Sequence, residues 1–322
     1  MPDEPNVLEL RSRVPGKSAG QPLGDYLAGR FRYHDRDAWA AHVTAGRVLV
    51  DGRSAHADDP VRAGAEVLYR KVHREPWVDD RIRVLHTDPD LVVVDKPAHL
   101  PMHADGPFVR HTLIHLLRTA HDFPDARVVH RLDRETSGVV VLPRTRRASR
   151  AVQEQFRAGT VEKLYLTVVA GRVEEHFHCD RPIGHSATSR IALRRSAAPD
   201  AVEPRPAFTR FAVVEHGPAA TLLRCQPTTG RTHQIRVHLE NCGHPVLGDK
   251  LYGRPDDDYL AFVHRMKAGG DPRAGPDDAP DRQLLHACSL EFDHPATGER
   301  VRYEAGAPPS FRDWLRRADR PS

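Results

Sequence analysis

Lysine, cysteine and long apolar segments are scarce in this chain of 322 residues. Apolar runs such as residues 91–94 and 139–142 fall far short of the roughly 20 residues that a membrane-spanning helix needs, so a membrane protein is excluded. The N-terminus carries early acidic residues and no apolar signal-peptide core, which predicts a cytoplasmic protein. The four cysteines form no C-x-x-C pair, so we expect reduced thiols rather than a zinc knuckle or a disulfide framework.

Arginine carries almost all of the positive charge. The chain has only six lysines, so 42 of its 48 Lys and Arg residues are arginines, against 44 Asp and Glu, and the net charge is +4. The guanidinium group suits phosphates and base edges, but a GC-rich genome would produce the same bias. Composition alone therefore favours a nucleic-acid partner only mildly.

The N-terminal part of the chain divides into a polar start and a small module. Residues 1–18 lack apolar periodicity, which predicts a flexible leader. Within residues 19–74, Leu23 and Leu27 fit one face of a short helix, and a second helix and strands follow. Asp51-Gly52 is a hairpin turn signal between two of these strands. We expect a compact module that a linker near Pro76 joins to the rest.

A larger region spans residues 80–318 and mixes predicted strands and helices without the regular alternation of a βαβ fold. Lys163, Tyr165 and Thr167 alternate with apolar residues in one predicted strand, so a lysine should lie beside a phenol on one face. Residues 254–282 are rich in Asp, Gly and Pro, which predicts a polar surface insertion with one helical patch near residues 260–266.

Standard nucleotide-binding and hydrolase motifs are missing. The chain contains no G-x-x-x-x-G-K, G-x-G-x-x-G, H-E-x-x-H or G-x-S-x-G, so nucleotide-driven chemistry has no support. The segment His176-Phe177-His178-Cys179 has metal-ligand residue types, and alternate histidines on a strand share a face. No further ligand stands at a familiar spacing, so we expect no metal. A metal-dependent hydrolase built on His178 is an alternative that chelators would test.

One dense polar segment, residues 128–142, is predicted to be two apolar strands around a polar turn. The turn holds Asp133 between Arg131 and Arg134, and the backbone must reverse at Ser137-Gly138. This arrangement displays a carboxylate beside cations at the ends of strands. A hairpin with ordinary surface ion pairs would have the same pattern, because such pairs are common and weak.

A second dense segment, residues 227–243, follows a predicted strand. Thr232 is a plausible N-cap, so we expect a helix that begins just after Arg231 and stops at Gly243. Arg231, His233 and Gln234 would then lie at a helix N-terminus, which favours anions such as phosphate or carboxylate. A capped surface helix without function is the alternative for this segment taken alone.

Together, these segments resemble a known family. The sequence HRLDRETSG at residues 130–138 and GRTHQIRVHL at residues 230–239 are similar to the two signatures of the RluA-type pseudouridine synthases. The resemblance covers about residues 80–305 and continues, in the family's order, through residues 95–97, 162–165, 248–253 and 285–287. It implies an α+β protein: a pseudouridine synthase fold with a mixed, mostly antiparallel sheet and a catalytic cleft, preceded by a small S4-like α/β module.

The N-terminal module itself is similar to the S4-like RNA-binding domain that many members of this family carry. Residues 46–52 match the turn-and-strand portion of that domain. The segment His34-Asp35-Arg36-Asp37 departs from it, because a more basic helix start with a serine is usual there. The two aspartates would weaken the grip on phosphate.

The resemblance also implies a reaction and a role for each site residue. The family cleaves the N1–C1′ bond of a uridine in RNA and rejoins the uracil through C5, without a cofactor. Asp133 takes the place of the catalytic aspartate and Tyr165 that of the active-site tyrosine, while Arg231 is expected to pair with Asp133. Lys163 would contact an RNA phosphate or assist Tyr165. The expected substrate-binding residues are His130, Arg131, Arg134, Lys163, His233, Gln234, Arg236, His238 and Leu285, of which Leu285 belongs to an apolar wall.

The sequence therefore predicts an isomerase that forms pseudouridine in structured RNA. Ribosomal RNA is the expected partner, transfer RNA is the second choice, and the protein is expected to act as a monomer. A catalytically idle RNA-binding protein on the same scaffold is the alternative. The intact Asp133, Tyr165 and Arg231 argue against that alternative.

Overall fold

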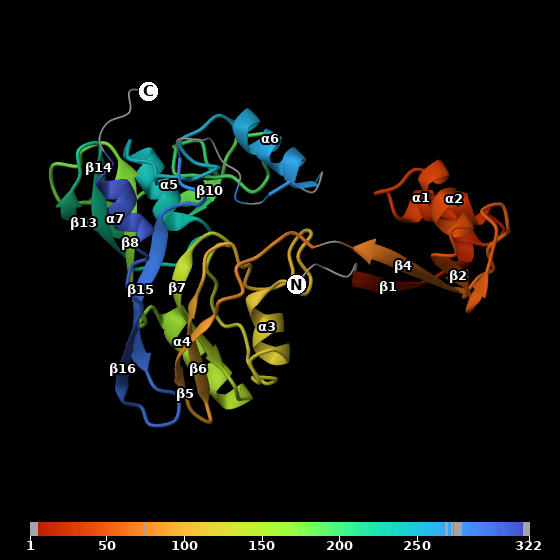
Figure 1. Cartoon of the computed structure of the whole chain (residues 1–322), viewed down its shortest axis with the longest axis horizontal. Coiled ribbons are helices and arrows are strands. Elements are labelled where there is room, and N and C mark those ends of the chain that lie inside the picture. The colour runs from red at the N-terminus through yellow and green to blue at the C-terminus, as the bar shows by residue number, and fades with distance from the viewer. Residues whose placement is uncertain (1–5, 74, 268–269, 272, 274–278, 318–322) are drawn as a thin grey trace. The chain divides into compact units, whose positions relative to one another are not determined.

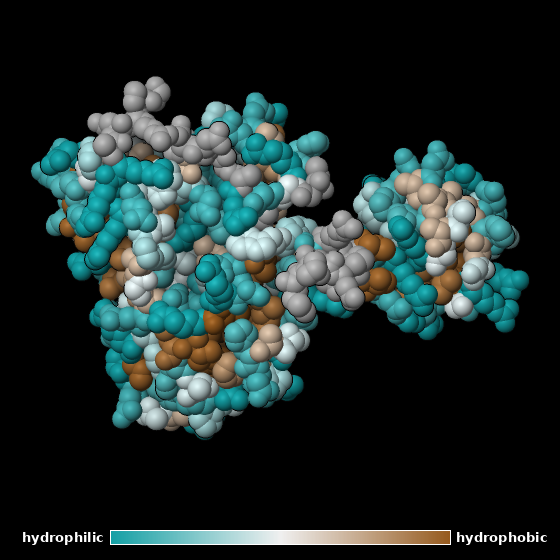
Figure 2. Space-filling model, in the orientation of Figure 1, coloured by the Kyte–Doolittle hydropathy of each residue, from teal (hydrophilic) through white to brown (hydrophobic). Residues whose placement is uncertain are grey.

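The computed structural model of the chain describes residues 6–73, 75–267, 270–271, 273 and 279–317 (Figure 1). The chain forms two compact units, residues 1–75 and 76–322. The surface is mostly hydrophilic in the view of Figure 2, with apolar areas that are small on each unit. In the described part of the chain, no helix is long and apolar enough to cross a membrane.

The N-terminal unit packs two helices on a four-stranded sheet. The predicted helices are confirmed as α1 (Leu23–Arg30) and α2 (Arg36–Thr44), and they bury Leu23, Leu27 and Trp39. The predicted hairpin turn is also confirmed, because Asp51 and Gly52 connect two strands with φ angles of 50° and 76°. A short 3-10 helix, η1, spans Gly16–Ser18. The strand order is β1-β4-β2-β3, with bounds β1 (Asn6–Arg13), β4 (Glu66–His73), β2 (Val48–Val50) and β3 (Arg53–Ser54).

The prediction of a flexible leader over residues 1–18 is wrong for the described residues. Strand β1 pairs with β4 in antiparallel register along its whole length. Its charged side chains find partners across the strand pair, since Arg11 lies 2.8 Å from Glu66 and Arg70 lies 3.4 Å from Glu9. The polar composition that suggested a leader is therefore the outer face of an edge strand.

The charged residues at the start of α2 interact with other residues of the N-terminal unit. The carboxylate of Asp35 caps the helix by accepting the backbone N–H of Ala38 at 2.8 Å. Arg36 forms ion pairs with Asp25 at 2.8 Å and Asp58 at 2.7 Å. These residues bind one another within the unit.

The C-terminal unit is built on one large mixed sheet, and the predicted α+β class is confirmed. The strand order is β5-β6-β7-β15-β8-β14-β13-β9, and β16 pairs with β15. All neighbours are antiparallel except β7 and β15, which are parallel. The bounds are β5 (Arg83–Thr87), β6 (Leu91–Lys96), β7 (Ser137–Pro143), β8 (Glu162–Ala170), β9 (Phe177–Cys179), β13 (Thr209–His216), β14 (Ala220–Pro227), β15 (Leu285–Asp293) and β16 (Arg300–Glu304).

The apolar runs of β6 and β7 are buried on both faces of this sheet. Val92 and Val94 pack with α3 (Leu113–Thr119), whereas Leu91 and Val93 pack with α4 (Arg146–Ala158) on the other side. Continuous rather than alternating hydrophobicity follows from this double cover. The remaining elements are α5 (Gln234–Asn241), α6 (Asp256–Lys267), α7 (Ser310–Leu315) and a small sheet of β10 (Ile183–His185), β11 (Arg195–Ser196) and β12 (Val202–Arg205).

The predicted hairpin around Asp133 is wrong, because residues 128–130 form no strand. Strand β15 pairs with β7 only at Ser137 and Gly138. Along the rest of that edge the preceding segment makes isolated bonds rather than a ladder, such as the N–H of Arg127 to the carbonyl of Pro143 at 2.9 Å. Near this segment the backbone N–H of Val141 donates to Nε2 of His130 at 3.1 Å instead of to a carbonyl. The segment before β7 is an extended loop that carries Asp133 to the end of the sheet.

Two further sequence expectations need correction. Helix α5 starts at Gln234, and Thr232 does not cap it: His233 occupies the N-cap with a left-handed φ of 59° and makes no side-chain cap. Residues 254–282 are not merely a surface insertion, because Phe262 and Arg282 are buried. The expected helical patch lies in α6, while residues 268–269, 272 and 274–278 lie outside the described residues.

Candidate active site

Asp133 lies in a tight loop at the start of β7. The backbone N–H of Thr136 donates to the carbonyl of Asp133 at 3.1 Å, which closes a turn between the two residues. At Gly138 the φ angle is 116°, and a Cβ atom would lie 2.1 Å from the carbonyl oxygen of Ala287 in β15. Only glycine lets the loop enter the sheet this close to β15. The side chain of Asp133 keeps 23% of its surface exposed.

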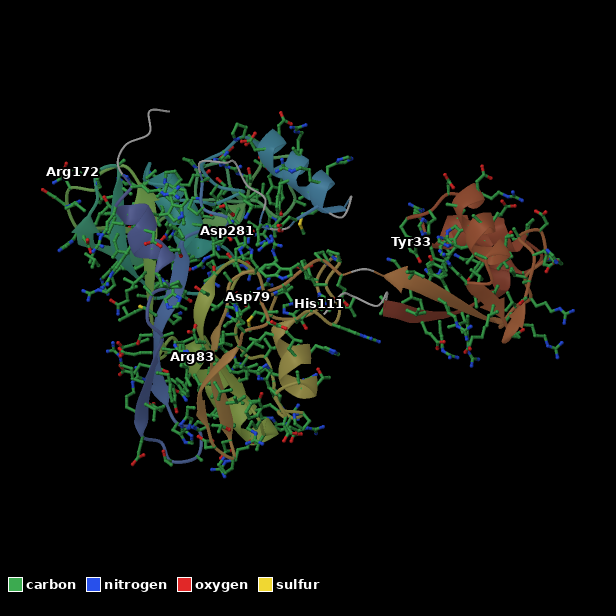
Figure 3. All side chains as sticks on the ribbon, in the orientation of Figure 1. Tyr33, Asp79, Arg83, His111, Arg172 and Asp281 are labelled. Carbon is green, nitrogen blue, oxygen red and sulfur yellow. The ribbon has the colours of Figure 1, made fainter. Side chains whose placement is uncertain are left out.

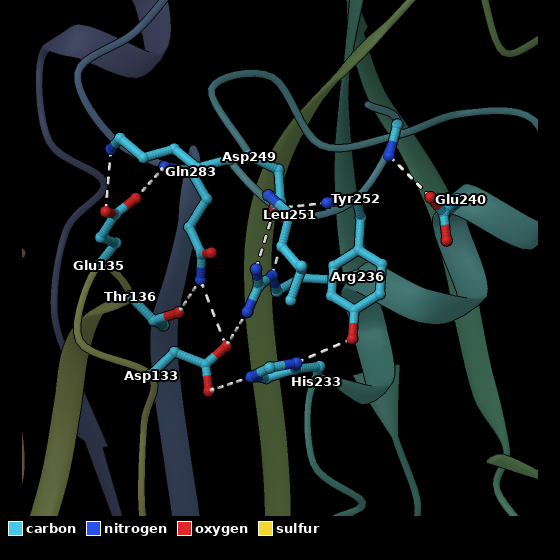
Figure 4. Close-up of polar contacts among 12 residues, drawn as sticks. Asp133, Glu135, Thr136, His233, Arg236, Glu240, Asp249, Leu251, Tyr252 and Gln283 are labelled. Atoms are coloured by element: carbon cyan, nitrogen blue, oxygen red, sulfur yellow. Dashed lines mark hydrogen bonds and ion pairs between the residues drawn. The ribbon is translucent and has the colours of Figure 1, made fainter. Parts of the chain in front are cut away.

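Arg236 of α5 holds this carboxylate (Figure 4). Its Nη1 donates to Oδ2 of Asp133 at 2.7 Å, while its Nε and Nη2 bind the two oxygens of Asp249 at 2.6 and 2.9 Å. Asp249 is fully buried and also accepts the backbone N–H groups of Leu251 and Tyr252. The bidentate grip of Asp249 fixes the plane of the guanidinium group, so its remaining edge points at Asp133.

The imidazole ring of His233 also lies near Asp133. Nε2 of His233 lies 3.9 Å from Oδ1 of Asp133, and Nδ1 lies 2.8 Å from the hydroxyl of Tyr252. Burial, followed by the charge of Arg236, lowers the pKa of His233 to about 4, so the ring is neutral at physiological pH. The hydroxyl of Tyr252 accepts the backbone N–H of Arg195 at 3.1 Å, which leaves its own proton for Nδ1. With Nδ1 as acceptor, the proton of neutral His233 is on Nε2, on the side of the carboxylate.

The loop that carries Asp133 is tied down from three other segments. The side-chain amide of Gln283 donates to Thr136 at 2.7 Å and lies 3.4 Å from Asp133. Lys250 binds the carboxylate of Glu135 at 2.9 Å. Lys96, fully buried at the end of β6, donates to the carbonyls of Pro97, Leu100 and Arg134. These contacts hold the position of Asp133 before any substrate arrives.

The surroundings keep Asp133 ionised. Burial would raise the pKa of this carboxyl, but His233, Arg236 and Gln283 outweigh burial and hold the pKa well below its usual range. The site therefore presents a carboxylate that is charged, fixed and partly exposed. Such a group can attack an electrophilic carbon or stabilise positive charge on a sugar.

Tyr165 of β8 lies beside this carboxylate, on the face that packs with Leu285. Burial, followed by the charge of Asp133, raises the pKa of the Tyr165 phenol, so it stays protonated at physiological pH. Its hydroxyl makes no hydrogen bond with another described residue. Lys163 makes no hydrogen bond with this phenol, and its Nζ donates to the carbonyl of Thr229 at 3.1 Å. Leu285 is buried in one apolar cluster with Tyr165 and Ile235, as expected for a wall.

The structure does not pair Arg231 with Asp133, which corrects the expected partner. Nε of Arg231 donates instead to the carbonyl of Pro206 at 3.0 Å. Because α5 begins with His233 in a left-handed conformation, Arg231 stays in the loop and Arg236, in the first turns of the helix, points to the carboxylate. The helix starts later than the sequence suggested, and this shift changes which arginine reaches the site.

Several expected substrate-binding residues have internal partners. The amide of Gln234 is buried and bonded to Thr229, Phe208 and Thr209. His238 is buried between the hydroxyl of Thr209 and the carbonyl of Arg181. These bonds join α5 to the start of β13.

The residues around Asp133 in the first signature differ in exposure. His130 accepts the N–H of Val141 and stacks on Phe156 at 4.7 Å, so its ring is part of the scaffold. Arg134 binds Glu135 at 2.7 Å. Arg131 is exposed and makes no ion pair with any described residue, so it is open to a ligand.

Sequence reasoning did not assign roles to Asp249, Tyr252 or Gln283. Asp249 and Tyr252 belong to the segment at residues 248–253 that resembles the family, but their functions depend on contacts with α5. In the sequence, the available signal for Asp249 was its position directly after a glycine, in Gly248-Asp249. Gln283 had no local signal, since its partners lie about 150 residues earlier in the chain.

The histidines that suggested a metal site lie in a cationic setting. Nδ1 of His176 accepts the backbone N–H of Val213 at 3.0 Å, and His178 stacks on Phe208 beside Arg210. Among the described residues, no group of three or more His, Cys, Asp or Glu side chains is arranged to hold a metal ion.

Comparison with known proteins identifies the family of this chain. Residues 90–241 match the family of RNA pseudouridylate synthases. The chain is 36% identical over 316 residues to ribosomal large subunit pseudouridine synthase D of Xanthomonas campestris. The aligned region covers 95% of this chain and 91% of that protein. The chain is also 33% identical over 288 residues to RNA pseudouridine synthase 7 of Arabidopsis thaliana, covering 85% of this chain and 71% of that protein.

A solved structure shows the same fold. The structure of human RNA pseudouridylate synthase domain containing 1 is 28% identical, covers 75% of this chain and 89% of its own, and has a TM-score of 0.59. Fold, site and sequence define an RNA-modifying isomerase. The chain belongs to the RluA-type family of RNA pseudouridine synthases.

Proposed function

We propose that this RNA pseudouridine synthase modifies uridines in ribosomal RNA and that Asp133 is its catalytic carboxylate. The observation that supports the role of Asp133 is its 2.7 Å contact with Arg236, which is itself fixed by the buried Asp249. A ribosomal substrate is supported by the names of relatives in Xanthomonas campestris and Pseudomonas aeruginosa, which are ribosomal large subunit pseudouridine synthases. Transfer RNA is the second candidate substrate.

In the proposed reaction, the carboxylate of Asp133 acts at C1′ of the flipped uridine while the N1–C1′ bond breaks. The uracil turns within the cleft and a C5–C1′ bond forms. The hydrogen on C5 is lost to a base and N1 gains a proton, so mass and redox state are unchanged. The ring of Tyr165 supports the uracil by stacking, and no cofactor is needed.

The N-terminal unit is proposed to be an S4-like RNA-binding module that adds affinity. The support is its sequence resemblance and its own compact fold of two helices on a small sheet. Since Asp35 and Arg36 are engaged within the unit, we expect few phosphate contacts at the start of α2. A chain starting near Trp77 should isomerise RNA at saturation with unchanged turnover but weaker affinity, and unchanged affinity would exclude the binding role.

The substitution Asp133→Asn tests the catalytic role. It keeps the size of the side chain but removes its charge and nucleophilicity, so we expect tritium release from C5-labelled uridine in RNA to be abolished while RNA binding is retained. Turnover within about tenfold of wild type would exclude Asp133 as the catalytic group.

Two controls separate the alternative functions. Activity should survive EDTA, whereas loss in chelator that zinc restores would support the metal-dependent hydrolase. If the wild-type chain binds RNA tightly but never releases tritium from any ribosomal or transfer RNA, the catalytically idle RNA-binding protein becomes the better description.

A further inference from the structure

A basic hollow lies on the large sheet, on the side away from Tyr165. It has a volume of about 380 Å³ and is lined mainly by residues of β9, β13 and β14 and the segment just before β9. Its polar lining is cationic or neutral and includes no carboxylate. We call it the arginine hollow, and define it by His176, His178, Arg210, Ala212, Arg224 and Gln226.

The strand register gathers these side chains on one face. Arg210 of β13 pairs with His178 of β9 on one side and with Gln226 of β14 on the other. Two residues further along β13, Ala212 pairs with Arg224 of β14. Ala212 lies in the middle of this set, and its side chain is small. No bulky side chain therefore fills the space between the two arginines.

The other face of the same strands belongs to the active site. Cys225 of β14 pairs with Tyr165 of β8, and it is buried with Leu223 against α5. Because side chains alternate across a strand, Arg224 and Gln226 point to the opposite face. The arginine hollow is therefore separate from the cleft that holds Asp133.

The two arginines of the hollow have no acidic partner among the described residues. Arg210 and Arg224 are exposed, and neither forms an ion pair or a side-chain hydrogen bond with any described residue. Arg210 is nevertheless held in place, since its guanidinium carbon lies 5.2 Å from the centre of the Phe208 ring. The ring of His178 stacks on Phe208 at 5.5 Å. This packing reduces the entropy that a ligand would have to overcome.

The polar groups of the hollow are mainly donors. His176 accepts a backbone N–H at Nδ1, so its neutral ring carries the proton on Nε2 and offers it as a donor. Arg210 and Arg224 are permanently charged donors, and Gln226 adds an amide. This set suits an anion, and it is unsuited to a metal cation.

We propose that the arginine hollow binds a backbone phosphate of the RNA substrate, at a contact outside the catalytic cleft. Diagonal neighbours on adjacent strands are about 7–8 Å apart, so Arg210 and Arg224 can bind one phosphate or two successive ones. The inference rests on RNA being the substrate, as the proposed function holds. It gives the enzyme a second point of contact with a large RNA and makes no contribution to bond rearrangement.

The test compares Arg210→Gln, Arg224→Gln and the double variant with wild type on a large ribosomal RNA fragment. The matched control is Arg172→Gln, at the rim of the same unit in Figure 3, because it removes the same charge from an arginine that is already paired with Glu174. Affinity is measured over a range of salt concentrations, and turnover is measured at saturating RNA. Arg210→Lys and Arg224→Lys keep the charge and should rescue most of the affinity.

The double variant should bind the fragment at least tenfold more weakly in low salt. Its log–log salt slope should fall by about 0.7 for each lost phosphate contact on single-stranded RNA. Turnover at saturation should stay within twofold of wild type, which separates this result from a failure of the proposed function. Unchanged affinity and slope would overturn the proposal, as would an equal loss in Arg172→Gln. Weaker binding of free phosphate or of uridine monophosphate with unchanged RNA affinity would assign the hollow to a small anion instead.

Discussion

Two arginine–carboxylate pairs, one from each unit of this protein, differ in burial and in what they hold. In the N-terminal unit, Arg11 and Glu66 join β1 to β4, and their side chains are 57% and 41% exposed. In the C-terminal unit, Arg236 and Asp249 are only 7% and 0% exposed. Exposed pairs contribute about 0–1 kcal/mol, whereas a buried charge that loses its partner costs about 3–5 kcal/mol. The first pair holds an edge strand, and the second keeps the carboxylate of Asp133 ionised and in place.

The sharpest test of this contrast compares Arg236→Gln with Arg11→Gln. The first substitution leaves Asp249 buried without its cation, so the free energy of unfolding should fall by about 3–5 kcal/mol. The second should change it by less than about 1 kcal/mol. Urea unfolding of both variants measures the difference. Similar losses in the two variants would mean that burial does not distinguish the pairs.

A smaller effect is expected at Tyr165, where ring and hydroxyl can be separated. Because the phenol stays protonated, Tyr165→Phe should keep turnover within about tenfold of wild type, less than the 10²–10⁴-fold that loss of a general base costs. Tyr165→Leu removes the ring and should lose about 1–3 kcal/mol of base stacking. Single-turnover rates and RNA affinities of both variants provide the comparison. Equal losses in the two variants would identify the hydroxyl as the essential group.

Measured per residue and per pH unit, the smallest expected effect is the pH dependence of stability that arises from two buried histidines. The pKa of His130 is lowered to about 4 by burial and then by Lys163, and that of His233 is lowered to a similar value. In the unfolded chain a histidine has a pKa of about 6.5, so below that pH the unfolded state binds more protons. Stability should therefore fall as the pH drops from about 6.5 to 4.

Each of these histidines should contribute up to about 1.4 kcal/mol per pH unit in this range. His130→Gln should remove its share, and urea unfolding between pH 7 and 4 tests this. A slope identical to that of wild type would contradict the assignment of His130 as a buried neutral residue. The pKa values of the carboxyls of Asp133 and Asp249 are lowered in the fold, so the stability they contribute is lost only at more acidic pH.

Local patterns in the sequence predicted most of the elements. The apolar runs of β6 and β7 and the Asp51-Gly52 turn each depend on neighbouring residues, and the structure contains all of them. Strand β1 was missed because its partner β4 lies more than 50 residues away and supplies the charges that balance it. Long-range pairing of this kind leaves no local periodicity.

In the site, too, the sequence predicted what depends on local residues and missed what depends on long-range contacts. The resemblance pointed to Asp133 and Tyr165, which lie together in the cleft, but it assigned the pairing arginine to Arg231. The left-handed His233 at the start of α5 determines which residues of that segment face Asp133, and residue types do not reveal this conformation. The role of Asp249 likewise depends on α5 packing against the loop at residues 248–252.

Our central proposal is that Asp133 is the catalytic carboxylate and that Arg236, rather than Arg231, holds it. The most direct test is the single-turnover rate of pseudouridine formation, at saturating RNA, in Arg236→Gln and Arg231→Gln. If Arg236→Gln does not fold, Arg236→Lys replaces it, because it keeps the charge but loses the bidentate grip of Asp249. We expect the Arg236 variant to lose at least 100-fold in rate and the Arg231 variant to stay within about threefold of wild type. A large loss in Arg231→Gln with a near-normal rate in the Arg236 variant would contradict the claim.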